Sequence, residues 1–379
     1  MLNHIYNINT ITAGATAQPR KRGTSGTTKH GTMPAPTTTK ASGCSERGGG
    51  GTQHHQQFTN GRQVTTGQRR KGATGNEARS QPPLLPPLTS VYDFKDVVGI
   101  GSGAFANVFR ARELIAAAPA ERYRHVALKR INLSAIEKEN QLMYQSVLNE
   151  VDIFKSLSHA NIVKCFYSFT EVSPHSGVKY LVLVLEYVNG GDLETWLQKS
   201  TNDCRVLLPE ADLWRVFAQI ADAVRYIHTK NIIHRDLKPP NVLMKKNNQA
   251  KLTDFGLSRQ QDGGSRANTV CGTPYYMSPE RIRELVYTAK SDVWSLGCIL
   301  YEMATLRSPF FGEKSNITSL TQKISDAEYP PVPDDSYSQP VTALIQYCLR
   351  PNAEERPTAA QVHRMAAVMA QRWEGTPPY

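Results

Sequence analysis

Two short segments in the second half of the chain hold the residues best suited to chemistry. The first, residues 234–241, reads H-R-D-L-K-P-P-N, and the second, residues 254–256, reads D-F-G. Carboxylate and amide oxygens bind hard cations such as Mg²⁺, and a carboxylate can also accept the proton of an attacking hydroxyl. An ammonium group beside them would offset phosphate charge. Together these residue types could bind a metal ion, accept a proton and offset the charge of an anionic substrate.

Two further motifs flank these segments. V-A-L-K at residues 126–129 comes before them, and S-P-E at residues 278–280 follows. One motif alone would be weak, since an aspartate after an arginine is most often part of a surface ion pair. All four, in this order and at these separations, match the signature set of protein kinases. The chain resembles that family over residues 92–369.

The resemblance implies a role for each polar residue of the two central segments. Asp236 would orient the substrate hydroxyl and accept its proton, a contribution of about 10² to 10⁴ in rate. Asp254 would be the main Mg²⁺ ligand and Asn241 the second. Lys238 would lie beside the γ-phosphate of ATP, and lysine in D-L-K-P favours serine and threonine as acceptors. Catalysis of this kind is mostly positioning.

Lys129 is expected on the third strand, in contact with the α- and β-phosphates, and needs a carboxylate to hold it. Glu150 is the best suited, because it shares a helical face with the apolar residues three before and four after it. A glutamate on an inward face is costly unless paired. Glu137 and Glu139 are alternatives, but they lie nearer the helix start, where acidic residues suit the dipole.

A glycine-rich loop is expected at residues 101–108, G-S-G-A-F-A-N-V. Taken alone it fits a plain hairpin turn as well as a nucleotide cover. Alanine stands where the third glycine usually falls, yet two glycines still let the backbone approach phosphates. The residues expected to contact the nucleotide here are Gly101, Ser102, Gly103, Ala104, Phe105, Ala106 and Val108.

The adenine ring of ATP is expected between apolar side chains from both halves of the kinase segment. Val108, Ala127 and Leu243 would sandwich the ring. Glu186 and Val188, on the connector between the halves, would offer backbone hydrogen bonds to its edge. Ordinary core and hinge packing explains the same residues equally well.

Longer runs narrow the resemblance to the NIMA-related (Nek) Ser/Thr kinases. These runs are C-G-T-P-Y-Y-M-S-P-E-R-I at residues 271–282, K-S-D-V-W-S-L-G-C at residues 290–298 and Y-P-P-V-P at residues 329–333. The short, catalytic-domain-only branch is the nearest match. That branch tolerates a residue other than glycine at the third loop position, as at Ala106, and often has leucine where Phe255 stands.

The resemblance also implies an activation segment at residues 254–280, with Thr269 as its phosphorylation site. Phosphate adds close to two negative charges, which Arg235 could pair with through two hydrogen bonds. Such a pair would order the segment. Ser265 and Thr273 are competing hydroxyls on the same segment.

Several residues around this segment are expected to act by holding it in place. The family pattern has Thr273 hydrogen-bonded to the catalytic aspartate and to the lysine two residues later. Glu280 is expected to pair with Arg356, and Asp292 to cap the catalytic loop. Cys271 could sense redox state, but a packing role is favoured without a lowered pKa.

The sequence pattern predicts two parts that position these residues, the first rich in strands and the second rich in helices. Residues 92–133 alternate apolar and polar positions around glycines, and residues 180–187 are again rich in β-forming types, which predicts strands. One helix interrupts them, since Val147, Val151 and Phe154 recur at spacings of four and three. This part is expected to be a small sheet with one main helix.

Helical periodicity dominates the following part. Apolar residues at 213, 217, 220, 224 and 227 predict a long amphipathic helix that Pro209 is suited to open. More helices are expected at residues 292–304, 341–349 and 358–369. The predicted class is therefore α+β, a bilobal protein-kinase fold with a β-rich N-lobe at residues 92–188 and a mostly helical C-lobe at residues 189–372.

Charge is unevenly distributed along the 379 residues, whose net charge is +11. Residues 1–80 hold 11 basic and two acidic residues, so this segment carries +9 and the rest is nearly neutral. The same segment contains 13 of the 26 glycines and few large apolar residues. Since it cannot bury enough surface to offset its chain entropy, residues 1–91 are expected to be a disordered, Gly/Thr-rich extension.

The ends of the chain carry weaker signals. Prolines 82, 83, 86 and 87 predict a stiff spacer before the folded part. Residues 1–22 lack acidic side chains and end in R-K-R, which weakly evokes a transit peptide or a nuclear localisation patch, against a plain solvated tail. Residues 373–379 are expected to be a short tail.

Cysteine usage and hydropathy bear on the compartment. The six cysteines are far apart and include no C-x-x-C pair, which favours free thiols in a reducing compartment. The most apolar stretch, residues 180–188, is much shorter than the roughly 18 residues that span a bilayer. We expect no membrane segment and a cytoplasmic chain, with nuclear or centrosomal and microtubule-associated sites as alternatives.

The sequence as a whole predicts an ATP- and Mg²⁺-dependent protein serine/threonine kinase, acting on protein substrates and activated by an upstream kinase. The family resemblance implies roles in mitotic spindle and centrosome regulation. A pseudokinase scaffold is the first alternative, although its usual mark, the loss of a catalytic residue, is not seen. Nucleic-acid binding through residues 1–80 is the second, motivated by charge; a nucleic-acid partner is not expected for the folded body.

Overall fold

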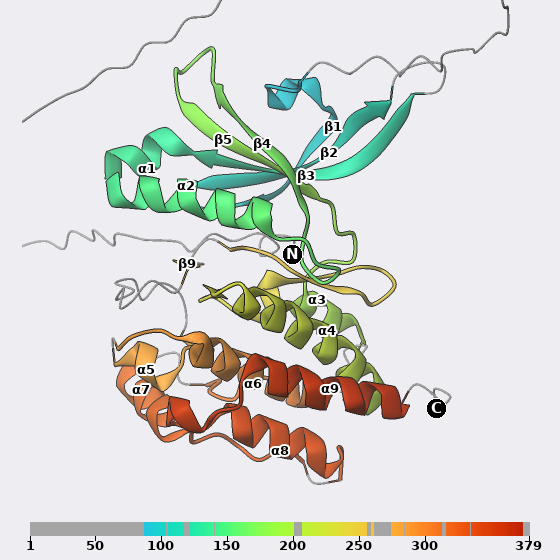
Figure 1. Cartoon of the computed structure of the whole chain (residues 1–379), viewed down its shortest axis with the longest axis vertical. Helices are drawn as coiled ribbons and strands as arrows, with labels where there is room; N and C mark the ends of the chain where they lie inside the picture. Colours follow the sequence, from blue (N-terminus) through green and yellow to red (C-terminus); the bar gives the residue numbers. More distant parts are fainter. Residues whose placement is uncertain are drawn as a thin grey trace, which may run out of the picture. The chain divides into compact units, whose positions relative to one another are not determined.

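A computed structural model describes residues 87–373, with gaps at 104, 117–120, 140, 201–206, 256–258, 261–273, 284, 313–315 and 334 (Figure 1). The predicted extension up to residue 86 and the tail from residue 374 lie outside the described residues. So do Ala104, Ser265, Thr269, Cys271 and Thr273.

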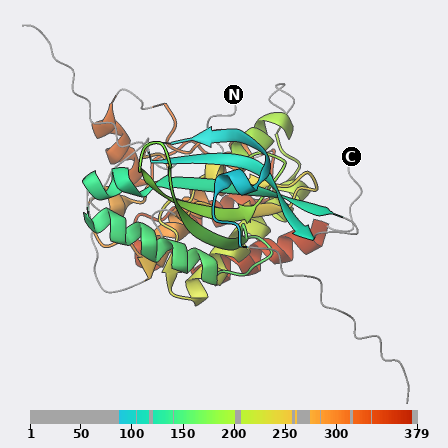
Figure 2. The ribbon, with the colours of Figure 1, turned by 90° about the horizontal axis from the view of Figure 1, so that it is seen from above.

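The first part of the described chain is an antiparallel sheet in the order β1-β2-β3-β5-β4, drawn in cyan to green in Figures 1 and 2. Its strands are β1 (Lys95–Ser102), β2 (Ala106–Ala116), β3 (Arg122–Asn132), β4 (Cys165–Val172) and β5 (Lys179–Glu186). Two helices lie between β3 and β4 in sequence, α1 (Leu133–Glu139) and α2 (Gln141–Ser156). The sequence predicted one main helix here, which corresponds to α2.

Side-chain alternation along β5 divides this sheet between two cores. Leu181, Leu183 and Leu185 belong to the large core cluster, whereas Val182 and Val184 face a smaller one. Successive side chains of a strand point to opposite faces, so an unbroken apolar run marks a strand buried on both sides. On the larger core's face, α2 contributes Val151 and Phe154, two residues of the predicted helical face.

The smaller core is closed by the residues just before β1. Val91, in the short helix η1 (Val91–Asp93), and Phe94 are buried against the sheet, while Tyr92 is 79% exposed. The N–H of Val91 donates to the carboxylate of Glu171 on β4 at 3.0 Å. Folded structure therefore begins before residue 92, the boundary predicted from sequence, because Leu88 also packs against this core.

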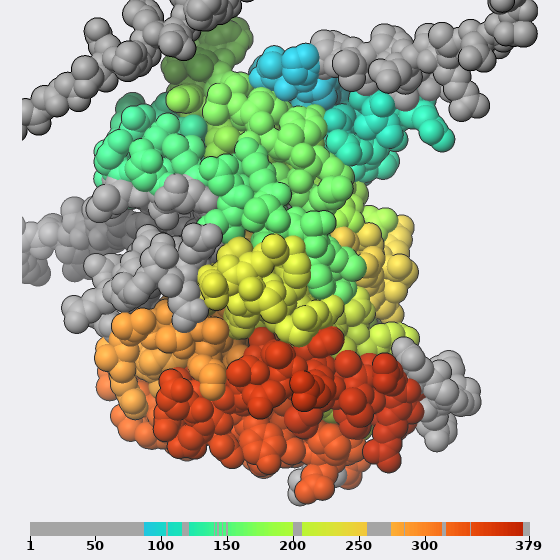
Figure 3. Space-filling view, viewed as in Figure 1, coloured from blue at the N-terminus to red at the C-terminus, as the bar shows by residue number. Residues whose placement is uncertain are grey.

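The second part is mostly helical, as predicted. Its helices are α3 (Leu193–Ser200), α4 (Glu210–Thr229), α5 (Pro279–Ile282), α6 (Ala289–Thr305), α7 (Ile317–Asp326), α8 (Gln339–Cys348) and α9 (Ala359–Trp373). Pro209 directly precedes α4, and α6, α8 and α9 correspond to the three further helices predicted. α9 packs along α4, and its surface is red in the space-filling view (Figure 3).

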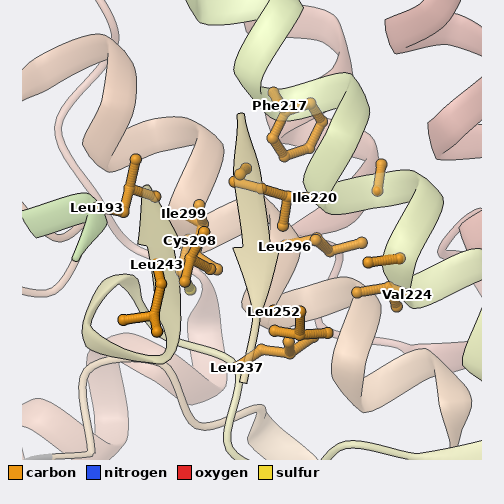
Figure 4. Close-up of a cluster of buried hydrophobic side chains, with 14 of the residues drawn as sticks. Leu193, Phe217, Ile220, Val224, Leu237, Leu243, Leu252, Leu296, Cys298 and Ile299 are labelled. Atoms are coloured by element: carbon orange, nitrogen blue, oxygen red, sulfur yellow. The ribbon is translucent and has the colours of Figure 1, made fainter. Parts of the chain in front are cut away.

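A single apolar cluster runs from the sheet into the helices. Around its middle, side chains of α4 and α6 surround Leu237, Leu243 and Leu252, which belong to the segments that carry the chemical motifs (Figure 4). The cluster also holds Cys165, Cys298 and Cys348, which are free thiols as expected. Among the described helices, none is long and apolar enough to cross a membrane. The arrangement agrees with the predicted bilobal α+β class.

Candidate active site

A small hairpin brings the two central motifs together. Strand β7 (Val242–Met244) pairs with β8 (Ala250–Leu252), and Val242 lies opposite Leu252. The N–H of Thr253 then donates to the carbonyl of Asn241 at 2.9 Å. Because Asn241 precedes one strand and Asp254 follows the other, both expected metal ligands lie at the same end of the hairpin.

The loop before this hairpin is anchored by one fully buried carboxylate. Asp292 accepts hydrogen bonds from the backbone N–H groups of His234 (2.9 Å) and Arg235 (3.0 Å), and from the hydroxyl of Tyr287 (2.9 Å). Its Oδ2 also lies 2.8 Å from Nε2 of His228. Burial would raise the pKa of Asp292, but the bond and charge of His228, with the help of His234, hold it below the usual value. The predicted cap of the catalytic loop is confirmed.

Backbone strain marks both sides of the site. Arg235 and Asp254 have φ angles of 71° and 60°, a region that residues other than glycine seldom adopt. Such a conformation costs about 1 to 3 kcal/mol and persists only where the surroundings fix it. The hydrogen bond from Arg235 N–H to Asp292 supplies part of that constraint.

Asp236 lies beside the two residues expected to work with it. Asn241 donates from Nδ2 to the backbone oxygen of Asp236 (2.7 Å) and to its Oδ2 (2.9 Å). Nζ of Lys238 lies 2.9 Å from the same Oδ2. Within the described residues, both of these side-chain contacts use Oδ2 and neither uses Oδ1. The carboxylate is 19% exposed, which leaves it accessible to a substrate hydroxyl.

Lys129 joins the sheet to the second motif. It lies on β3 as predicted, and its Nζ is 2.9 Å from Oδ1 of Asp254, with both side chains buried. The pair connects residues 125 positions apart. Glu150 lies on α2, but its side chain is outside the described part of the structure, whereas the alternatives Glu137 and Glu139 are exposed on α1.

Phe255 of the D-F-G motif links α2 to the catalytic loop. Its ring centroid lies 5.0 Å from that of Phe154 and 4.9 Å from that of His234. His234 is buried, which lowers the pKa of its imidazole, and its Nε2 is 3.0 Å from the carbonyl of Thr253. Neither ring contact was predicted from the sequence, because the residues on either side of Phe255 do not show which rings it meets in the fold.

The expected glycine-rich loop forms the turn between β1 and β2. Gly101 pairs with Val108 and Ser102 with Asn107, and Gly103 N–H donates to Ala106 O at 2.7 Å. Ala106 is buried in the large core, so the methyl group at the third loop position packs into the protein. Phe105 packs partly against the same core, and its carbonyl accepts from the N–H of Asn132 at 2.7 Å.

The residues expected around adenine come from three strands. Val108 on β2, Ala127 on β3 and Leu243 on β7 are all buried in the continuous core cluster. Val188, on the connector, is buried as well. These positions agree with the core and hinge packing that the sequence allowed, and contact with a nucleotide stays a prediction.

Two glycines bring the connector against the hairpin. The N–H of Met244 donates to the carbonyl of Gly191 at 2.8 Å, and Gly191 has a φ of +88°. A Cβ atom on Gly190 would lie only 2.3 Å from the Met244 carbonyl oxygen. A larger residue at position 190 would therefore push the connector off β7.

A buried ion pair holds Glu280, at the end of the segment predicted to be an activation segment. Arg356 contacts Glu280 with two nitrogens, at 2.8 and 2.9 Å, which confirms the predicted pair. Burial would raise the pKa of Glu280, but the Arg356 guanidinium and the Ser291 hydroxyl hold it below its usual value. The guanidinium carbon lies 4.9 Å from the Trp294 ring centroid.

A second carboxylate near this segment was missed by the sequence analysis. The hydroxyl of Tyr276 donates to Glu302 on α6 at 2.5 Å. Burial raises the pKa of Glu302 to about 7, and the nearby charge of Glu194 adds to the rise. Isolated tyrosines and glutamates are common, so no sequence signal distinguished this pair.

The donor set fits Mg²⁺ and a triphosphate. Asn241 uses Nδ2 for both of its side-chain bonds, which leaves the amide oxygen as its ligand group, at the same end of the hairpin as Asp254. In the described residues no group of three or more His, Cys, Asp or Glu could hold a metal alone. Mg²⁺ commonly takes one or two protein oxygens together with substrate phosphates, and the cation of Lys129 suits the same phosphates.

Comparison with known proteins places the chain in a family. Residues 94–367 match the protein kinase domain family. The chain is 34% identical to the serine/threonine-protein kinase Nek10 of Homo sapiens over 294 residues, which is 76% of this chain and 24% of that protein. The chain belongs to the protein kinase family and, within it, to the Nek serine/threonine kinases.

Other relatives agree with this assignment. The probable serine/threonine-protein kinase nek2 of Dictyostelium discoideum is 40% identical over 229 residues, covering 60% of this chain and 52% of that protein. The serine/threonine-protein kinase nekl-2 of Caenorhabditis elegans is 34% identical over 275 residues, 71% of this chain and 72% of that protein. The chain spans about a quarter of Nek10, and its likeness to the short branch of the family stays a prediction.

Proposed function

We propose that the protein transfers the γ-phosphate of Mg-ATP to serine or threonine hydroxyls of other proteins. The observation that carries the proposal is the 2.9 Å contact between Lys129 and Asp254, which joins the sheet to the D-F-G motif. Asn241 and Asp236 lie at the same hairpin end as Asp254. Membership of the Nek serine/threonine kinases supports the class of acceptor.

Each side chain has a task that follows from its position. Asp236, with Oδ2 held by Asn241 and Lys238, orients the acceptor hydroxyl and takes its proton. Lys129 offers a buried positive charge to the phosphates. When bound, Mg-ATP supplies the phosphoryl group and the metal that neutralises its charge, with Asn241 and Asp254 as the protein's oxygen ligands. Exclusion of water around the buried Lys129–Asp254 pair strengthens these interactions.

Phosphorylation of Thr269 by an upstream kinase is the proposed activation step. Arg235, next to the catalytic aspartate, is the proposed partner of the phosphate, and Thr273 the proposed contact to the catalytic loop. The cation of Arg235 lies 5.9 Å from the Tyr287 ring centroid, at the loop that Asp292 anchors. A phosphate paired with Arg235 would therefore act on a loop that also carries the general base.

The cellular proposal follows the family. We propose protein substrates in mitotic, centrosomal or microtubule regulation, and a cytoplasmic location with nuclear or centrosomal sites. The proposal rests on what the resemblance to the Nek family implies.

Radiolabel transfer from ATP to casein tests the activity, with wild type and Asp236→Ala compared at equal concentration. The wild-type protein should label casein, and the rate of the variant should be about 10²- to 10⁴-fold lower, because the general base is removed. Equal labelling by both proteins would overturn the mechanism. No labelling by phosphorylated wild type would favour the pseudokinase scaffold instead.

A further inference from the structure

The carboxylate of Glu186, at the end of β5, contacts two lysines of the β7–β8 hairpin. Nζ of Lys245 lies 2.9 Å from its Oε1, and Nζ of Lys251 lies 2.7 Å from its Oε2. Only a backbone role toward adenine was predicted for Glu186 from the sequence. That backbone role stays a prediction. The side chain of Glu186, together with Lys245 and Lys251, forms what we call the two-lysine clamp, which joins the end of β5 to the β7–β8 hairpin.

Lys251 is the more buried of the two lysines of the clamp. The Lys251 side chain is 7% exposed, and its ammonium also donates to the carbonyl of Ile162 at 3.3 Å. Burial alone would raise the pKa of Glu186, but the hydrogen bonds and charges of Lys251 and Lys245 bring it below the usual value. The carboxylate is therefore ionised at neutral pH and holds both cations.

The backbone of Glu186 is fixed at the same point. Its N–H donates to the carbonyl of Lys164 at 2.8 Å, and Lys164 N–H lies 3.4 Å from Oε2 of Glu186. On β5, Glu186 also lies opposite Val126 of β3, three residues before Lys129. Side chain, backbone and strand pairing thus fix the first residue of the connector from three directions.

The hairpin that carries the two lysines also carries the active-site groups. Lys251 lies on β8 opposite Leu243, one of the residues expected around adenine. The other end of the hairpin leads to Asn241 and Asp254. If the connector moved relative to this hairpin, the backbone groups expected to bind adenine would therefore move relative to the expected metal ligands.

We infer that Glu186 is a positioning residue for nucleotide binding. Its clamp with Lys245 and Lys251 holds the connector backbone at a fixed distance from the β7–β8 hairpin, so that adenine fits between them. The inference rests on the proposed function, since it concerns the same site. It predicts that loss of the clamp weakens nucleotide binding more than it slows the chemical step, because Asp236, Lys238 and Lys129 keep their own contacts.

The molecule offers a matched control for a simple stability effect. Glu171 on β4 contacts Nε of Arg130 at 2.6 Å and accepts the N–H of Val91 at 3.0 Å. Like Glu186 it is a mostly buried carboxylate with a cationic partner and a backbone donor. It does not bridge to the hairpin, because Val91 and Arg130 both belong to the N-lobe. Glu171→Gln should therefore lower stability without changing nucleotide affinity.

The experiment measures ADP affinity by calorimetry with Mg²⁺, the KM for ATP and kcat with casein, and the melting temperature without nucleotide. The variants are Glu186→Gln, Lys251→Met and Lys245→Met, with Glu171→Gln and the neighbouring exposed Lys246→Met as controls. Glu186→Gln should weaken ADP binding and raise KM about tenfold, with kcat within about twofold. Lys251→Met should weaken ADP binding about fivefold, and Lys245→Met, which removes a more exposed lysine, about twofold.

The outcomes distinguish failure of the inference about Glu186 from failure of the proposed kinase function. Clamp variants that melt lower than wild type but bind ADP as wild type does would overturn the inference and leave the proposed function standing. An equal rise in KM for Glu171→Gln would also overturn it, because the effect would then be general destabilisation. Wild type that binds no ADP would overturn the proposed function itself.

Discussion

Two carboxylates, Asp292 and Asp236, contribute to the loop at residues 234–241, and they are held in different ways. Asp292, beneath the loop, receives three hydrogen bonds and contacts His228, and it is fully buried. Asp236, on the loop, is 19% exposed, and its contacts from Asn241 and Lys238 both use Oδ2. Asp292 is contacted on both oxygens, whereas the contacts to Asp236 leave Oδ1 for the acceptor hydroxyl in the proposed mechanism.

The comparison separates a structural carboxylate, Asp292, from the proposed catalytic carboxylate, Asp236. A buried charge costs several kcal/mol unless donors surround it, and Asp292 has such donors. Two of them are backbone N–H groups of the catalytic loop, from His234 and Arg235, so these bonds both stabilise Asp292 and fix the loop in its strained conformation. Asp236 depends on that fixed loop for its direction. The anchor stabilises the fold, and the reactive carboxylate uses the rigidity that the anchor provides.

The largest expected effect is on catalysis at Asp236. Asp236→Asn keeps the side chain's shape but removes the base, so kcat should fall by about 10² to 10⁴. The free energy of unfolding should change by less than about 1 kcal/mol, because a partly exposed ion pair contributes little. Casein labelling and urea titration measure the two quantities. A large loss of stability would remove the distinction drawn between the two carboxylates.

Asp292→Asn should show the opposite pattern. An amide nitrogen cannot accept the bonds that Asp292 accepts, so the free energy of unfolding should fall by about 3 to 5 kcal/mol. Asp96→Asn, which breaks an exposed pair with Arg112, is the control and should cost no more than about 1 kcal/mol. Urea titration compares them. Similar losses for the two variants would show that the anchor carries no special share of stability.

A smaller effect concerns pH. The pKa of Glu302 is raised in the folded protein to about 7 from an ordinary 4.5, so its contribution to stability is complete below pH 4.5 and is lost as pH rises through 7. Glu302→Gln mimics the protonated acid and should remove this loss, which is at most about 3 kcal/mol.

Thermal unfolding of wild type and Glu302→Gln between pH 5 and 8.5 measures this difference. The two curves should converge at the acidic end and separate at the alkaline end, with the variant more stable there. Asp292 and Glu280 have lowered pKa values, so their contributions are lost only as pH falls below about 4 and do not interfere. Parallel curves would mean that Glu302 titrates normally.

Much of the site could be predicted because its residues occur in fixed order. The motifs around Asp236 and Asp254 predicted which residues meet, and the structure brings them to one end of the β7–β8 hairpin with Lys129. The pairs Glu280–Arg356 and Asp292 with the catalytic loop were predicted from the same resemblance. Helices such as α4 followed from apolar spacing, because amphipathic helices expose their period directly.

The remaining features depend on contacts that carry no local pattern. Val91 precedes the predicted domain start, yet it closes a second core, since only the folded sheet creates that surface. The clamp on Glu186 and the bond from Tyr276 to Glu302 join side chains from distant segments. Single lysines, tyrosines and glutamates are usually solvated, so pairing of this kind becomes visible only in three dimensions.

The central claim is that Lys129, Asp236, Asn241 and Asp254 form one metal–nucleotide site. Calorimetry of ADP binding, with and without Mg²⁺, tests it most directly in wild type and Asp254→Asn. Mg²⁺ should strengthen ADP binding to wild type about tenfold or more and have little effect in the variant, because the main metal ligand is lost. ADP affinity that is independent of Mg²⁺ in wild type, or equally Mg²⁺-dependent in both proteins, would contradict the claim.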